Sequence, residues 1–169
     1  MRHVISALVQ NTPGVLAHVA GMFSARGFNI DSLVVGRTDD PRFSRMTIVA
    51  IGDDRTIEQV RKQLDKLVTV VRVRDFQDTE YVERDLMMLR VAATPEKRAE
   101  IIELVGLFRG RVIDVAKQSL TIELSGTEHK LEALIDLLRP YGIRELARTG
   151  VIAMQRGRQS DGRTEDDEQ

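Results

Sequence analysis

The segment Asn11-Thr12-Pro13-Gly14 contains residue types that could bind a small anion. It follows a short apolar stretch, Val4 to Val9, and precedes apolar residues at helical spacing. Thr12 can cap a helix, Pro13 fits its first position, and Gly14 lets the backbone come close to another group. The free N–H groups and the dipole of such a helix N-terminus attract an anion such as a carboxylate. An ordinary capped helix start would look the same, so a structural and a ligand-binding role both stay open.

Asn29 is the second polar candidate. Asparagine is disfavoured in strands, yet Gly27-Phe28-Asn29 stands at the start of a predicted strand. Asn29 therefore either adopts a left-handed turn conformation or faces a ligand or a second copy of the chain. Asn11 could likewise accept a hydrogen bond from an ammonium group or donate one to a backbone carbonyl.

Other chemistry is not indicated by the sequence. His3, His18 and His129 lie in different predicted elements, without cysteines or paired carboxylates at metal-ligand spacing. No catalytic triad or phosphate-binding loop is evident, and Gly106 to Gly110 is typical of a helix end. Asp53 and Asp54 have the positions of helix caps. We therefore expect no metal site, no cofactor of its own and no catalysis by this chain alone.

Composition excludes several classes of protein. The 25 basic and 26 acidic residues give a formal net charge of -1, which offers no electrostatic reason to expect nucleic acid or membrane binding. No apolar run approaches the roughly 18 residues that a membrane span needs, and the N-terminal run is too short for a signal peptide. The absence of cysteine suits a reducing compartment. The expected location is the cytoplasm.

The elements around these residues predict a ferredoxin-like domain. Strands are expected at 4–9, 29–36, 43–52 and 68–73, and helices at 13–26 and 54–67. The order βαββαβ gives a four-stranded antiparallel sheet with both helices on one face. Because the other face and the sheet edges have no cover, we expect this domain to pair with a second copy.

The second half repeats this order with little residue identity. Its strands are expected at 85–93, 111–116, 119–125 and 143–154, with a helix from Thr94-Pro95 that buries Ile101, Ile102, Val105 and Phe108, and another around Leu131 to Leu138. The predicted fold class is α+β, with two ferredoxin-like βαββαβ domains. Their expected bounds are 1–76 and 85–156, joined by a polar linker, 77–84, and followed by a disordered tail, 157–169.

Three stretches of the first half together resemble a known family. They are QNTPGVLAHVAGMFSARGFNIDSLVVG, FSRMTIVAIGDD and IEQVRKQLDKLVTVVRV. Residues 3–75 resemble the amino-acid-binding ACT domain, specifically that of the small, regulatory subunit of acetolactate (acetohydroxyacid) synthase. The Pro-Gly helix start is common to many ACT domains, whereas RGFNI followed by SLVVG and SRMTIV is more specific. The second half, with RDLMMLRVAA, resembles the C-terminal domain of the same family.

The resemblance implies a regulatory subunit without an active site. In such subunits the ACT domains pair as a homodimer, and valine or another branched-chain amino acid binds between them. A separate catalytic subunit holds thiamine diphosphate, Mg²⁺ and FAD and joins two 2-oxoacid units. The small subunit raises that activity and confers feedback inhibition in valine, leucine and isoleucine biosynthesis.

The resemblance also implies which residues bind the effector. The positions that match the family's motif are Asn11, Gly14, Val15, Leu16, Asn29 and Ile30. In this reading Asn11 and Asn29 supply polar contacts, Gly14 and its neighbours supply backbone amides, and Leu16 and Ile30 form part of an apolar wall. Glu96 follows Thr94-Pro95 in the second half where the motif has glycine, so no second effector site is expected. The alternative function, a free-standing ACT-type amino-acid sensor or transcriptional regulator, is disfavoured by the balanced charge and the absence of an evident helix-turn-helix.

Overall fold

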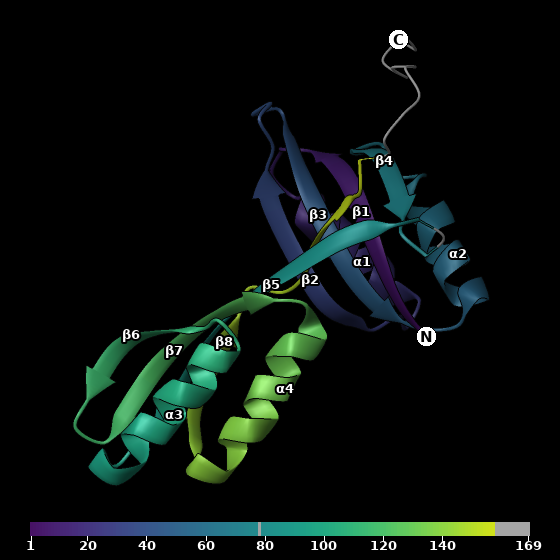
Figure 1. Ribbon diagram of the computed structural model, residues 1–169. Coiled ribbons are helices and arrows are strands. Elements are labelled where there is room, and N and C mark those ends of the chain that lie inside the picture. Colours follow the sequence, from purple (N-terminus) through teal and green to yellow (C-terminus); the bar gives the residue numbers. More distant parts are fainter. Residues whose placement is uncertain (78, 158–169) are drawn as a thin grey trace.

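The chain folds into two successive units of the same order, strand, helix, strand, strand, helix, strand (Figure 1). The computed structural model describes residues 1–77 and 79–157, so the tail predicted beyond Gly157 lies outside the described residues. The elements of the first unit are β1 (Arg2–Gln10), α1 (Val15–Ala25), β2 (Ile30–Arg37), β3 (Phe43–Ile51), α2 (Asp54–Leu64) and β4 (Val70–Asp75).

The sheet of the first unit is antiparallel, with the strand order β2-β3-β1-β4, so β2 and β4 are its edges. Successive residues of a strand point to opposite faces, which gives β1 and β3 one face packed against both helices. The core on that face includes Ile5, Ala7, Met46, Ile48, Val19, Phe23, Val60 and Leu64. The predicted ferredoxin-like arrangement is confirmed.

The two ends of α1 differ in how well they were predicted. Thr12 and Pro13 were expected to cap and open the helix, but its N-cap is Gly14, so this prediction is wrong by two residues. The physical reason is the backbone of Gly14, whose φ of 88° lies in the left-handed region and turns the chain into the helix. At the other end Gly27 also has a positive φ, and Phe28 N–H donates to the Phe23 carbonyl, as expected for a glycine stop.

The second unit has the same topology. Its elements are β5 (Tyr81–Ala92), α3 (Pro95–Leu107), β6 (Arg111–Ala116), β7 (Ser119–Gly126), α4 (Glu128–Leu138), the 3₁₀ turn η1 (Arg139–Tyr141) and β8 (Ile143–Arg148). The sheet order β6-β7-β5-β8 matches that of the first unit, and α3 and α4 cover one face (Figure 1). Ile101 and Val105 are buried as predicted, whereas Ile102 is 46% exposed because it lies on the outer side of α3.

The strand β5 belongs to both units. Its first residues, Tyr81–Arg84, were predicted as linker, but they pair with the last strand, β9 (Ile152–Gln155). This two-stranded ribbon crosses the face of the first sheet that the helices leave open (Figure 1). Its contacts form a small apolar cluster of Val4, Val49, Phe76, Val151 and Ala153. The open face is thus partly covered by the chain's own C-terminal strand, and the predicted linker is shorter than 77–84.

Candidate functional site

The N-terminus of α1 has backbone donors and open space around them. No side chain of the described residues caps it, and its first turn contains no acidic residue. A Cβ added to Gly14 would meet no atom within 4 Å. Because the first N–H groups of a helix have no intrahelical acceptor and carry a partial positive charge, this end suits a carboxylate.

Asn11 fixes the loop before α1 and keeps one acceptor free for a ligand. Its backbone N–H donates to the Arg42 carbonyl at 2.7 Å, and its Nδ2 donates to the Pro41 carbonyl at 3.0 Å. Both acceptors lie in the turn between β2 and β3, so the loop is held against that turn. With Nδ2 engaged, Oδ1 of Asn11 is the atom that could accept from an ammonium group.

The two apolar residues that open α1 point in different directions. Val15 is 4% exposed and belongs to the core, whereas Leu16 is 47% exposed. The Val15 side chain is therefore structural, and only its backbone could contact a ligand. The Leu16 side chain is available to contact an aliphatic ligand at the same end of the helix.

Asn29 and Ile30 lie at the opposite end of α1. This helix has 11 residues, which gives it a length of about 16 Å at 1.5 Å per residue. Within one chain, Asn11, Gly14, Val15 and Leu16 therefore come together, while Asn29 and Ile30 stay apart from them. Arg109 is the one non-glycine residue with positive φ in the described segments, so the left-handed interpretation of exposed Asn29 is wrong.

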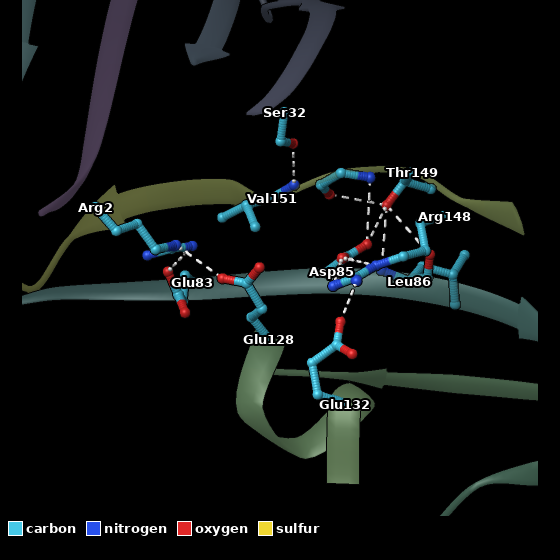
Figure 2. A network of polar contacts seen from close by, with 11 residues as sticks. Arg2, Ser32, Glu83, Asp85, Leu86, Glu128, Glu132, Arg148, Thr149 and Val151 are labelled. Atoms are coloured by element: carbon cyan, nitrogen blue, oxygen red, sulfur yellow. Dashed lines mark hydrogen bonds and ion pairs between the residues drawn. The ribbon is translucent and has the colours of Figure 1, made fainter. Parts of the chain in front are cut away.

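A buried polar cluster at the boundary of the two units was not predicted from the sequence. We call it the domain junction and define it as Asp85, the turn Arg148–Val151 and Ser32 (Figure 2). Asp85 is 2% exposed. Its Oδ2 accepts from Arg148 Nε at 2.8 Å, and its Oδ1 accepts from Thr149 Oγ1 and from Gly150 N–H, both at 3.2 Å. The interruption of the last extended segment at Thr149-Gly150 was the available sequence signal.

The domain junction reaches the first unit through β2. Gly150 has φ of 89°, and a Cβ built on it would stand 2.6 Å from Ser32 Oγ and 2.9 Å from Val34 Cγ2. The neighbouring Val151 N–H donates to Ser32 Oγ at 3.2 Å. Glycine is favoured at position 150 because of its positive φ and because a side chain there would clash with the side chains of Ser32 and Val34.

Two arginines form ion pairs at the same boundary, and one of them, Arg2, pairs across it (Figure 2). Arg148 pairs with Glu132 of α4 at 2.5 Å as well as with Asp85. Burial lowers the pKa of the Arg148 guanidinium, but hydrogen bonds and charge from Asp85 and Glu132 outweigh this and raise its pKa above the usual value. Arg2 of β1 pairs with Glu128 at 2.8 Å and Glu83 at 3.1 Å, and its pKa is raised by the same balance.

The rest of the described chain offers little other chemistry. Among residues 1–77 and 79–157, no three His, Cys, Asp or Glu side chains are grouped so as to hold a metal ion. His18 and His129 are exposed, while His3 is buried with its Nε2 3.6 Å from Asp54 Oδ1. Over the same residues, no helix is both long enough and apolar enough to cross a membrane.

Known proteins match both units. The family model described as the AHAS small subunit-like ACT domain matches residues 5–72, and the model for the small subunit of acetolactate synthase matches residues 84–157. The probable acetolactate synthase small subunit of Archaeoglobus fulgidus is 55% identical over 157 residues, which cover 93% of this chain and 98% of that protein. The acetolactate synthase small subunit of Mycolicibacterium smegmatis is 50% identical over 155 residues, or 92% of this chain and 91% of that protein.

A solved structure extends the match to the whole arrangement. The crystal structure of the acetolactate synthase small subunit from Thermotoga maritima superposes with a TM-score of 0.85 at 44% sequence identity. The superposition covers 94% of this chain and 99% of that chain. Both units and their order are therefore shared.

Proposed function

Because the chain belongs to the family of acetolactate synthase small subunits, we propose that it activates a separate catalytic subunit and makes that subunit sensitive to valine. The chain is the regulatory, non-catalytic partner in this enzyme. Under the proposal, thiamine diphosphate, Mg²⁺ and FAD belong to the catalytic subunit, and the chain works with it in the cytoplasm. Valine, or another branched-chain amino acid, is the effector.

The observation that carries the effector site is the uncapped start of α1. An amino acid has a carboxylate for the helix N–H groups near Gly14 and an ammonium for Oδ1 of Asn11. A branched aliphatic side chain would contact exposed Leu16. The carboxylate, the ammonium and the aliphatic side chain of the ligand would thus each contact a different group at the start of α1.

A second copy of the chain would complete the site. Asn29 and Ile30 lie about 16 Å from Gly14 along α1, too far to touch the same small ligand in one chain. Edge strand β2 has one free side, and a two-fold axis beside it would align β2 with the partner's β2 in opposite directions. The start of β2 in one copy would then lie near the start of α1 in the other, which supports a homodimer with the effector between ACT domains.

The regulatory effect follows from linkage. Valine can inhibit only if it binds one arrangement of the dimer better than another, and if the favoured arrangement activates the catalytic subunit less well. A ligand held between two protomers meets this condition, because its contacts depend on how the two copies dock.

The test is an acetolactate assay with the purified cognate catalytic subunit, alone and with this chain. The chain should raise the activity, and added valine should lower it again. A catalytic subunit that gains no activity from the chain would contradict the proposal. If the chain binds valine in a thermal-shift assay but never stimulates the enzyme, a free-standing amino-acid sensor becomes the better account.

A further inference from the structure

We propose that the domain junction transmits effector binding from the first unit to the second. This inference rests on the proposed function, because it takes the start of β2 as part of the effector site. The residues of the domain junction would act as positioning residues for regulation and would not themselves touch the effector. They are Asp85, Arg148–Val151 and Ser32.

The start of β2 joins the effector residues to the junction. Ile30 is opposite Ala50 of β3, but Ser32 is opposite Val49, so Asp31 is the extra residue of a β-bulge. A bulge interrupts the ladder and lets the strand bend locally. Asn29 and Ile30 therefore lie on one side of this bulge in β2, and Ser32 lies immediately on the other side.

The turn lies directly against β2. The backbone of Gly150 faces the side chains of Ser32 and Val34, where an added Cβ would clash, and Val151 N–H donates to Ser32 Oγ. Packed protein interiors transmit displacement because they contain little free volume at such contacts. Under the proposal, a movement of Ser32 displaces Gly150 and Val151 through this hydrogen bond and these contacts.

Asp85 links that turn to the second unit. One buried carboxylate binds the side chains of Arg148 and Thr149 and the N–H of Gly150, so these groups move together. Arg148 in turn is paired with Glu132 of α4 (Figure 2). Hydrogen bonds between charged partners are stronger than neutral ones. A shift of the turn is thus passed to a helix that packs on the second sheet.

The junction also stands at the point where the two units could hinge. Along β5, residues 81–84 pair with β9 over the first sheet, whereas residues 87–91 pair with β8 in the second. Asp85 and Leu86 lie between these two segments, and both are hydrogen-bonded to the turn. Beside them is a cavity of about 490 Å³ between Asp31–Leu33 of β2 and the acidic side chains of α4. The cavity leaves room for the second unit to move.

The experiment uses two substitutions in the junction and two matched controls, each in the full chain with its catalytic subunit. Ser32→Ala removes the acceptor of Val151 N–H, with exposed Ser125→Ala as its control. Gly150→Ala introduces the clash with β2. Its control, Gly142→Ala, has a similar φ of 95° but meets only Ala92 Cβ at 3.8 Å. Gly142→Ala therefore reproduces the backbone strain without the contact.

Three quantities are measured for each variant: the valine-induced thermal shift, the activity without valine, and the ratio of valine-free to valine-saturated activity. Ser32→Ala and Gly150→Ala should keep the thermal shift and the activation, while their inhibition ratio falls about two- to tenfold. Ser125→Ala and Gly142→Ala should behave like the unaltered chain in all three.

Two results would overturn the inference. One is an unchanged inhibition ratio in both junction variants, and the other is loss of the thermal shift in Ser32→Ala, which would make the junction part of the binding site. In both cases the unaltered chain still responds to valine, so the proposed function survives. An unaltered chain that neither binds valine nor is inhibited by it would overturn both.

Discussion

The two units share one topology but begin their first helices in different ways. In the first unit α1 starts at Gly14, with a left-handed backbone and no acidic residue in its first turn. In the second unit α3 starts after Thr94 with an extended backbone, and Glu96 lies in its first turn. The helices therefore present opposite electrostatic conditions at equivalent places.

Glu96 places a carboxylate of the chain itself at the start of α3, where α1 has none and is proposed to bind that of a ligand. A backbone N–H and the Thr94 hydroxyl hydrogen-bond to the Glu96 carboxylate and hold its pKa below the usual value. A helix start that already binds a carboxylate has no further need of an external one. The comparison teaches that one fold can be repeated while the proposed binding site is not, since that site depends on a few residues at one loop.

The same contrast extends to the other polar groups. Those at the start of α1 are exposed, whereas Asp85 of the second unit is buried and fully engaged in the domain junction. Changes to the first set should therefore affect effector binding, and loss of the buried Asp85 carboxylate should lower stability in addition to any effect of the domain junction on regulation.

The largest expected effect is that of Asp85→Ala. Removing the carboxylate leaves the Arg148 guanidinium and two other donors without their partner, which should cost about 3 kcal/mol of unfolding free energy. Urea unfolding of the variant measures this. The control is Arg90→Ala, whose pair with Glu145 is exposed and should cost less than about 1 kcal/mol. Equal losses of unfolding free energy in Asp85→Ala and Arg90→Ala would contradict the prediction that the buried ion pair stabilises the fold more than the exposed one.

Gly14→Asp should have the next largest effect, and it should act on binding. The new carboxylate would stand where we place that of the effector, and repulsion between like charges should weaken valine binding about tenfold or more. Aspartate tolerates the left-handed region better than most residues, and nothing within 4 Å opposes a Cβ here, so stability and activation should persist.

The isosteric variant Gly14→Asn isolates the role of charge. It has the same bulk as Gly14→Asp without the carboxylate, so it should retain more affinity for valine. Calorimetric titration of both variants makes the comparison. Equal affinities would show that bulk, and not the charge of the helix start, excludes the ligand.

Asn29→Ala should have a smaller effect on binding. The loss of one polar contact is worth about 1 kcal/mol, which corresponds to a roughly fivefold weaker affinity for valine. Because Asn29 is exposed and lacks a left-handed backbone, unfolding should change by no more than about 0.5 kcal/mol. A large loss of stability with normal affinity would restore the structural interpretation of this residue.

The smallest effect concerns Glu96 and pH. Its folded pKa is lowered, so its stabilisation of α3 is present above the unfolded pKa and is lost as the pH falls through the folded pKa. The protection of the first amides of α3, measured as the exchange rate relative to the intrinsic rate at each pH, should therefore fall on acidification in the unaltered chain but not in Glu96→Gln. The first turn of α1 has no carboxylate and should show no such difference between the two proteins.

Much of this architecture could be predicted from local patterns. Apolar periodicity and glycine or proline boundaries were sufficient for both βαββαβ units, and the Asp53 cap of α2 is present, with Thr56 N–H donating at 2.7 Å. The predicted start of α1 was two residues too early, because Thr12-Pro13 is a strong cap signal. A left-handed Gly14 has no distinct sequence pattern that would have corrected it. Local sequence also identified Asn11, Gly14 and Asn29 as candidates, but not that α1 keeps the first two apart from the third.

The long-range features could not be predicted in this way. The pairing of Tyr81–Arg84 with β9 joins residues about 70 positions apart, and the polar character of residues 77–84 resembles a linker. The bonds of Asp85 likewise depend on a turn more than 60 residues later. Such contacts are set by the path of the whole chain, which no local window contains.

The most direct test of the account is a two-dimensional ¹H–¹⁵N spectrum of the full chain during titration with valine. The account predicts that the amide signals of Gly14, Val15, Leu16, Asn29 and Ile30 shift together with one affinity, while those of Glu96 and Lys97 at the start of α3 stay in place. Shifts confined to the second unit, or none at the start of α1 at saturating valine, would contradict it.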